Sequence, residues 1–313
     1  MTRPRIWQTL LAFATIYLVW GSTFLAIRIG VHEVPPFLLA ALRFLLAGGV
    51  MVAFMRARGV APPTAREWRS AFLLATLIFL SNYGLVFWAE TRIPSGVTAV
   101  MQATIPAFMA LAEIVVLGTQ RLSLRLGAGL AVGLVGVAVL TGDSLGLGAA
   151  AIDRISAGAL LIASFSWSLG SALTRKVPLP GSKAMSSGAQ MLAGGVWLAV
   201  AAIALGETRS FDPRAVSASA WLALLYLVVA GSIVAFTAYL WLLDHESPTR
   251  VGTYAYVNPV VAVLLGYFAA DEPLGPRTVA GTACVLLSVV MITTTPRGPV
   301  PPRTQVDRPS RRA

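Results

Sequence analysis

The sequence predicts an all-α polytopic membrane protein with ten transmembrane helices, arranged as two inverted repeats of five helices (5+5). Of its 313 residues, 57% are hydrophobic and only 12% are charged, and the mean hydropathy is +0.76. Apolar runs of roughly 20 residues, the length that spans a bilayer core, recur along the chain. Trp88 and Pro106 recur as Trp241 and Pro259, each pair shifted by 153 residues. These observations predict one helical unit that is used twice in a membrane.

The charged residues argue against nucleic acid as a partner. The net charge of +11 comes from arginines between the apolar runs and in the C-terminal tail, not from one folded basic face. An excess of Lys and Arg is typical of the cytoplasmic loops of membrane proteins. The single cysteine, Cys284, excludes an internal disulfide and a cysteine metal cluster. The first apolar run is too long for a signal-peptide core, so we expect a retained helix there.

Each expected helix follows from an apolar run and the residues that bound it. Pro35 and Pro36 suit the start of the second helix, where a missing N–H costs nothing. Thr64 and Glu67 match a capping box ahead of the third. The expected spans are approximately 7–29, 36–55, 65–88, 95–117, 124–141, 155–173, 184–205, 218–243, 248–269 and 276–293.

The loops divide the chain and orient it. We expect a cytoplasmic N-terminus at 1–6, a first repeat at 7–141, a linker at 142–153, a second repeat at 154–294 and a disordered basic tail at 295–313. With both termini in the cytoplasm, seventeen Lys and Arg residues fall inside and six outside, which is the bias of membrane proteins. Because five is odd, the second repeat enters from the opposite side, as in the inverted repeats of secondary transporters.

Several motifs in one order resemble a known family. They are Trp20-Gly-Ser-Thr-Phe-Leu-Ala-Ile-Arg-Ile-Gly30, Pro35-Pro36, Leu42-Arg-Phe-Leu-Leu-Ala47, Ser247-Pro248 and Tyr254-Ala-Tyr-Val-Asn-Pro-Val-Val-Ala-Val-Leu-Leu-Gly266. From about residue 7 to residue 293 the chain is similar to the EamA family of the drug/metabolite transporter superfamily, and most similar to its YedA-like permeases. The resemblance implies ten helices, an alternating-access carrier and a central cavity lined mainly by helices 1, 3, 4, 6, 8 and 9.

The chain departs from that family's pattern after the fourth helix. Members often carry Gly-Glu after the fourth helix and again after the ninth. This chain has Gly118-Thr-Gln120 at the first place and Asp271-Glu272 at the second. No role can therefore be carried over to an acid at the first place.

The fourth helix carries a candidate polar face. Its members follow one another at helical spacing: Thr98, Gln102, Pro106, Met109 and Glu113. A carboxylate inside an apolar helix is costly unless it faces a cavity or a partner. Glu113 therefore either lines the pathway, as a cation contact or proton carrier, or pairs with an arginine near the cytoplasmic end, such as Arg175.

Other helices add candidate residues. Asn82 is an amide in an apolar span and needs partners, whether its role is structural or functional. Ser168 belongs to a stripe of small hydroxyls that is more typical of helix packing. Arg43 either binds a substrate carboxylate or reaches the outer headgroups. The other candidates for the cavity wall are Trp20, Thr23, Tyr83, Trp88, Trp167, Tyr254 and Asn258, of which the aromatic ones alternatively anchor helices at the interfaces.

The two mid-helix prolines are candidate hinges. Pro106 and Pro259 each deprive the carbonyl four residues earlier of its helical donor. In lipid such a carbonyl must find another partner or line water. We expect both prolines at the seam between the two halves, with Gln102 and Asn258 near the bilayer midplane.

These features predict a secondary transporter that exports small organic solutes by alternating access. Candidate solutes are amino acids, related metabolites or amphipathic drugs. The alternatives are transport of a sugar or lipid-linked metabolite, or intramembrane transfer of a lipid-linked group. An enzyme needs clustered acids or a nucleophile with a base, whereas this chain has scattered acids and two separated histidines. The sequence thus predicts no catalytic residue, metal or cofactor.

The expected partners follow from that function. They are the solute and the lipid bilayer of a bacterial inner membrane, with proton or ion coupling left open. The chain has no Gly-x-x-x-x-Gly-Lys-Ser/Thr motif, so ATP is not expected to drive it directly. Both a monomer and a homodimer are compatible with the sequence.

Overall fold

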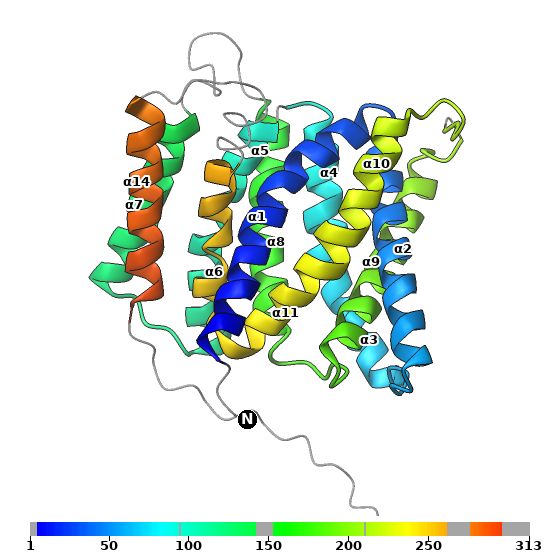
Figure 1. The fold of residues 1–313 in the computed structure, drawn as a ribbon, viewed down its shortest axis with the longest axis horizontal. Coiled ribbons are helices and arrows are strands. Elements are labelled where there is room, and N and C mark those ends of the chain that lie inside the picture. Colours follow the sequence, from blue (N-terminus) through cyan, green and yellow to red (C-terminus); the bar gives the residue numbers. More distant parts are fainter. Residues whose placement is uncertain (1–4, 94, 142–152, 210, 262–275, 296–313) are drawn as a thin grey trace, which may run out of the picture.

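Every regular element in the described part of the computed structural model is a helix (Figure 1). The structure describes residues 5–93, 95–141, 153–209, 211–261 and 276–295. Six helices are long and apolar enough to cross a membrane: Ile6–Val31, Pro36–Ala57, Ala65–Glu90, Arg154–Leu173, Lys183–Ala204 and Ala218–His245. Shorter apolar helices lie at Ile105–Leu117, Leu124–Val139 and Val279–Thr293. The all-helical prediction is confirmed for these residues, and the fold is consistent with a polytopic membrane protein.

The first half of the chain forms the following elements. They are α1 (Ile6–Val31), α2 (Pro36–Ala57), α3 (Ala65–Ala75), η1 (Thr76–Tyr83), α4 (Gly84–Glu90), α5 (Ser95–Gln102), α6 (Ile105–Ala112), η2 (Glu113–Leu117) and α7 (Leu124–Thr141). Pro36 begins α2, as predicted. The Thr64 hydroxyl accepts from the Glu67 backbone N–H at 3.3 Å, and the Glu67 carboxylate accepts from the Thr64 backbone N–H at 2.7 Å. The predicted capping box is therefore confirmed.

The second half of the chain forms the following elements. They are α8 (Arg154–Leu173), α9 (Lys183–Ala204), α10 (Ala218–Tyr226), η3 (Leu227–Val234), α11 (Ala235–His245), α12 (Pro248–Val251), a helix at 254–261 and α14 (Pro276–Thr293). The elements η1, η2 and η3 are π-helical segments. The predicted linker, basic tail and stretch 262–269, together with the Asp271-Glu272 pair, lie outside the described residues.

The fourth and ninth predicted helices are interrupted by turns. A turn at 103–104 separates α5 from α6, and Pro106 lies in the first turn of α6, where its missing N–H costs little. A second turn, at 252–253, separates α12 from the helix at 254–261, in which Pro259 lies. The expected span over 95–117 is therefore interrupted near its proline, and the break lies two residues before Pro106. Both prolines are buried.

Helices from the two halves pack against each other in related pairs. The helix α2 packs along α9, and α7 packs along α14. Near them, α1 packs against α10 and α11, while α8 packs against η1 and α4. In Figure 1 the α7–α14 pair forms one side of the bundle and the α2–α9 pair the other, with α1 and α8 between them. The start of α1 and the end of α14 lie at the same end of the bundle.

Two loop carboxylates join the halves at the opposite end. Glu33 accepts hydrogen bonds from the Ser217 backbone N–H at 2.6 Å and from the Ser217 hydroxyl at 2.7 Å. These donors, the hydroxyl first, lower the pKa of Glu33 below its usual range. Glu207 accepts from the Leu38 backbone N–H at 2.8 Å, in the first turn of α2. Each carboxylate therefore binds the N-terminal end of a helix from the other half, where unpaired N–H groups favour an anion.

Glycines bring α2 and α9 into close contact. A Cβ on Gly48 would lie 2.5 Å from the backbone N of Leu192 and 2.9 Å from the backbone O of Gly188. Small residues let two membrane helices approach until their backbones touch. Because backbone atoms of a packed helix cannot move aside as a side chain can, Gly48 is fixed by this contact.

Gly48→Ala should destabilise the protein, because the new methyl group has to push α2 and α9 apart. We expect a loss of about 1–3 kcal/mol, the usual cost of overpacking. The matched control is Gly49→Ala in the same helix, where an added Cβ meets nothing within 4 Å. That variant should be neutral or stabilising, since alanine is the better helix former. Thermal unfolding in detergent compares them, and equal unfolding temperatures would contradict the proposed contact.

Candidate functional site

A small, partly enclosed cavity of about 40 Å³ lies between α1, the third helix, the broken fourth helix, α8 and the helix at 254–261. Its wall consists of Trp20, Thr23, Phe24, Ile27, Asn82, Tyr83, Val86, Gln102, Ile105, Trp167, Tyr254 and Asn258. A buried water needs at least about 10–15 Å³ of such space. In this conformation the cavity therefore has room for a few waters but not for an organic solute.

The structure brings most of the sequence-predicted residues together in this wall. They are Trp20, Thr23, Asn82, Tyr83, Gln102, Trp167, Tyr254 and Asn258. Gln102 and Asn258, expected near each other from the positions of the two prolines, line the same space. The sequence reasoning missed Phe24, Ile27, Val86 and Ile105. Helical spacing could have found three of them, since Phe24, Ile27 and Val86 follow Trp20, Thr23 and Asn82 by four residues.

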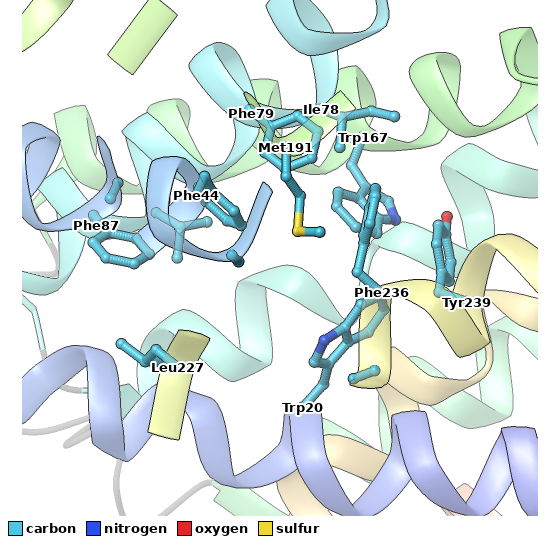
Figure 2. Packing of buried hydrophobic residues seen from close by; sticks show 14 of the residues in the cluster. Trp20, Phe44, Ile78, Phe79, Phe87, Trp167, Met191, Leu227, Phe236 and Tyr239 are labelled. Carbon is cyan, nitrogen blue, oxygen red and sulfur yellow. The ribbon is translucent and has the colours of Figure 1, made fainter. Parts of the chain in front are cut away.

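Aromatic rings form one part of the wall. Trp20 lies with its ring centroid 5.5 Å from that of Trp167 and 4.8 Å from that of Tyr254, both in edge-to-face geometry. Its indole Nε1–H donates to the backbone O of Gly231 at 3.0 Å. Figure 2 shows Trp20, Trp167 and Tyr239 pointing toward one another from α1, α8 and α11. Helices of both halves therefore share one aromatic cluster, which gives the cavity a rigid apolar face.

Amide side chains form the polar part of the wall. The Asn82 amide Nδ2 donates to the backbone O of Ala163 at 3.0 Å, which fixes η1 against α8. The Gln102 Oε1 accepts from the Ser164 hydroxyl at 2.5 Å. The Asn258 Oδ1 is buried and has no hydrogen-bond donor among the described residues. Asn258 is thus placed to accept a hydrogen bond from a molecule in the cavity.

The remaining predicted residues lie outside the cavity wall. Trp88 stacks under the guanidinium of Arg92, whose Cζ lies 3.9 Å from the centroid of the ring. Thr98 is buried. Met109 is also buried and packs against Gly252, since a Cβ on that glycine would lie 2.8 Å from its Sδ. The Ser168 hydroxyl donates to the backbone O of Ser164 at 2.8 Å, which is the packing role that its stripe suggested.

Glu113 is surrounded by hydrogen-bond donors. Its Oε2 accepts from the Thr249 hydroxyl at 2.6 Å and from the Thr249 backbone N–H at 3.1 Å, and its Oε1 accepts from the Thr119 hydroxyl at 3.2 Å. Arg175, the partner weighed from the sequence, donates instead to the backbone O of Leu243 at 2.7 and 2.8 Å. The Glu113 carboxylate therefore caps the start of α12 and links the two halves of the chain.

Arg43 is buried inside the bundle, with 1% of its surface exposed. The sequence left open whether this side chain binds a substrate carboxylate or reaches the headgroups, and burial excludes the second reading. Its Nε–H donates to the Ser232 hydroxyl at 2.8 Å. The physical reason is local: η3 and η1 enclose the guanidinium before it can reach the helix end. Among the described residues, no three His, Cys, Asp or Glu side chains gather to hold a metal.

An apolar helical bundle around a small cavity lined by aromatic and amide side chains is consistent with a polytopic membrane protein. The chain belongs to the EamA-like transporter family, whose model matches residues 7–142 and 154–294. It is 37% identical to the "Uncharacterized inner membrane transporter YedA" of Escherichia coli (strain K12), over 90% of this chain and 89% of that protein. The resemblance seen in the sequence is therefore confirmed.

Other comparisons agree with this membership. The chain is 28% identical to the "Probable amino-acid metabolite efflux pump" of Salmonella typhimurium, over 87% of this chain and 90% of that one. A solved crystal structure, titled only as that of a protein, matches with a TM-score of 0.73 and 25% identity, over 93% of this chain and 97% of the other. Relatives that span nearly the whole chain are thus named as transporters and efflux pumps.

Glu113→Gln should lower stability, because an amide NH₂ replaces one acceptor oxygen among three donors. Hydrogen bonds to charged groups contribute about 1.5–3 kcal/mol each, so we expect a loss of that order. Thermal unfolding in detergent measures it, with Glu67→Gln, a change at the half-buried cap of α3, as control. A Glu113→Gln protein with wild-type stability that no longer transports would instead favour the proton-carrier hypothesis.

Proposed function

We propose that this protein is a secondary transporter that exports small organic solutes by alternating access through the central cavity. The observation that carries the proposal is the cavity itself: it lies where helices of both halves meet, and its wall combines aromatic rings with amides. Binding sites for small molecules are mostly apolar pockets with a few well-placed polar groups. Membership of the EamA-like transporter family supports transport as the purpose of this cavity.

Alternating access accounts for the small volume of the cavity. A site for a drug-sized ligand measures about 300–1,000 Å³, whereas this cavity measures about 40 Å³. The helices must therefore move apart before a solute can enter. The turns at 103–104 and 252–253 border the wall helices, and such breaks let the two parts of a span move separately.

The packing of the halves supports the inverted-repeat prediction. Exchanging the two halves converts the pair of α1 with the helix Ala218–His245 into the pair of α8 with the helix Ala65–Glu90. The same exchange maps α2 onto α9 and α7 onto α14, which pack on each other. We therefore retain ten spans in two inverted repeats, with both termini in the cytoplasm of a bacterial cell.

The solute class is proposed from chemistry and from relatives. Amino acids, related metabolites or amphipathic drugs suit a wall of Trp20, Trp167, Tyr254 and Asn258. The name of the Salmonella relative points to amino-acid metabolites. Coupling to a proton or an ion is part of the proposal, and a sugar or a lipid-linked metabolite is the alternative cargo. An intramembrane transferase is the rival enzyme, and turnover of a bound ligand would reveal it.

Transport measurements test the hinge role of the two prolines. Pro106→Ala and Pro259→Ala should slow efflux from proteoliposomes several-fold while leaving the unfolding temperature equal or higher, because alanine suits a straight helix better. Pro36→Ala, at a helix start away from the cavity, is the matched control and should transport as the wild type does. A double alanine variant with the wild-type rate would refute the hinge proposal.

Single-cysteine labelling tests the orientation. In a Cys284→Ala background, cysteines placed in the loop after α2 and in the C-terminal tail should react only from the cytoplasmic side. A cysteine in the loop at 205–209 should react only from outside. A tail that labels from the periplasm would remove the argument for two inverted repeats.

A further inference from the structure

We propose that Arg43 binds the carboxylate of the transported solute, so that the cargo is a small organic acid or amino acid with an apolar body. This inference rests on the proposed transport function and specifies its substrate class. It starts from one unusual feature: a fully buried arginine in the middle of α2, beside the cavity wall.

Within the described part of the chain, Arg43 has no anionic partner. Its Nε–H donates to the neutral Ser232 hydroxyl at 2.8 Å, while its Nη1 is buried and has no acceptor among the described residues. No carboxylate of those residues lies within ion-pair distance of it, since the pairs found are Lys183 with Asp244 and Arg250 with Glu246. A buried charge without a counter-ion is costly, and an anion brought by a ligand would offset that cost.

Three aromatic rings enclose the guanidinium. Its Cζ lies 4.7 Å from the ring centroid of Phe44, 5.0 Å from that of Tyr83 and 6.0 Å from that of Phe87. Rings at these distances attract a cation through their π faces. They stabilise the charge without neutralising it, and they accept no hydrogen bond from Nη1. The cation is therefore held in place and remains able to bind an anion.

Two wall residues connect Arg43 to the cavity. Tyr83 stacks near the guanidinium and also lines the cavity. On the other side, a Cβ on Gly231 would lie 3.0 Å from both Arg43 Nη2 and the Thr23 Cγ2, and Thr23 is a wall residue. The guanidinium is therefore separated from the cavity by a single layer of side chains, and Gly231 leaves that layer thin.

Two of the residues that contact the Arg43 guanidinium, Tyr83 and Ser232, lie in π-helical segments. Tyr83 ends η1, and Ser232 lies within η3, where its hydroxyl donates to the backbone O of Leu227 at 2.9 Å. Such segments are rare and recur at functional sites. A return of η1 to α-helical geometry would rotate Tyr83 about its helix. In the proposed open state this rotation moves the Tyr83 ring aside, so that the guanidinium faces the cavity in which the solute binds.

The chemistry selects a carboxylate. A planar guanidinium binds a carboxylate through two parallel N–H···O bonds. One cation balances one negative charge, whereas a phosphate dianion needs more, and none of the described residues that line the wall is a lysine or arginine. Trp20 and Trp167 provide surface for an apolar body, and the Asn258 Oδ1 provides an acceptor for an amine.

Matched probes test this assignment on the purified full-length protein in detergent. The probes are 3-phenylpropionate and 3-phenylpropionamide, which have nearly the same shape and differ in charge, with isobutyrate and isobutyramide as a smaller pair. The apparent Kd comes from the concentration dependence of the thermal unfolding temperature. The proteins are wild type, Arg43→Gln, Arg43→Lys and the exposed control Arg58→Gln.

The wild type and Arg58→Gln should bind one of the carboxylates at least tenfold more tightly than its amide. Arg43→Gln should bring the two affinities within twofold of each other by weakening the carboxylate alone. Arg43→Lys keeps the charge but loses the two-pronged geometry, so its preference should be intermediate. It also serves as the decisive variant if Arg43→Gln does not fold.

Three results would overturn the inference. If Arg43→Gln still prefers the carboxylate over the amide, or if Arg43→Lys prefers it as strongly as the wild type does, Arg43 is a structural residue and does not bind the solute. Equal binding of acid and amide by the wild type would refute the carboxylate assignment and leave the transport proposal standing. No binding of any probe by folded wild-type protein would refute the assignment, and proteoliposome efflux of other solutes would then decide the transport proposal separately.

Discussion

Backbone hydrogen bonding is the constraint on which the rest of this structure depends. In the hydrocarbon of a membrane an unpaired N–H or C=O has no water to bind, so a spanning segment must satisfy its own backbone. The described part of the chain is accordingly helical in all its regular elements. Each interruption of a helix then has to lie inside the protein, where other groups replace the missing bonds. The fold thereby concentrates its irregular backbone at the seam between the halves.

The turns at 103–104 and 252–253 show which groups replace the missing backbone hydrogen bonds. Thr104 closes the first turn by donating its hydroxyl to the backbone O of Met101 at 2.8 Å. Thr253 closes the second by donating to the backbone O of Arg250 at 2.7 Å. One device thus serves both halves, although the second turn lies further from its proline than the first. The prolines contribute by removing donors, and the threonine hydroxyls satisfy the carbonyls that the turns expose.

Two of the buried charged side chains, Glu113 and Arg43, have opposite surroundings. Glu113 has hydrogen-bond donors on both carboxylate oxygens. Two of these donors belong to Thr249 in the first turn of α12, in the other half of the chain. Arg43 has aromatic rings and the neutral hydroxyls of Ser232 and Tyr83 around it. A satisfied charge joins helices, because removing it leaves several groups unpaired. A charge left without a counter-ion is a stronger indication of a ligand, and the side chain that the sequence singled out first, Glu113, is not the one in that condition.

The sequence by itself determined the class of the protein, the starts of helices such as α2 and α3, and much of the cavity wall. Composition and run length are sufficient for the class, and local signals such as Pro36 and the Thr64–Glu67 box act within one turn of a helix. Helical spacing placed Gln102 on the polar face of its helix, and the apolar span around Asn82 predicted an amide that needs partners. Only the tertiary structure decided where the helices break, that Glu113 meets Thr249 136 residues away, and that Arg43 is enclosed by η1 and η3. These outcomes depend on contacts between segments far apart in the chain, and no local pattern of residues specifies which distant groups will meet.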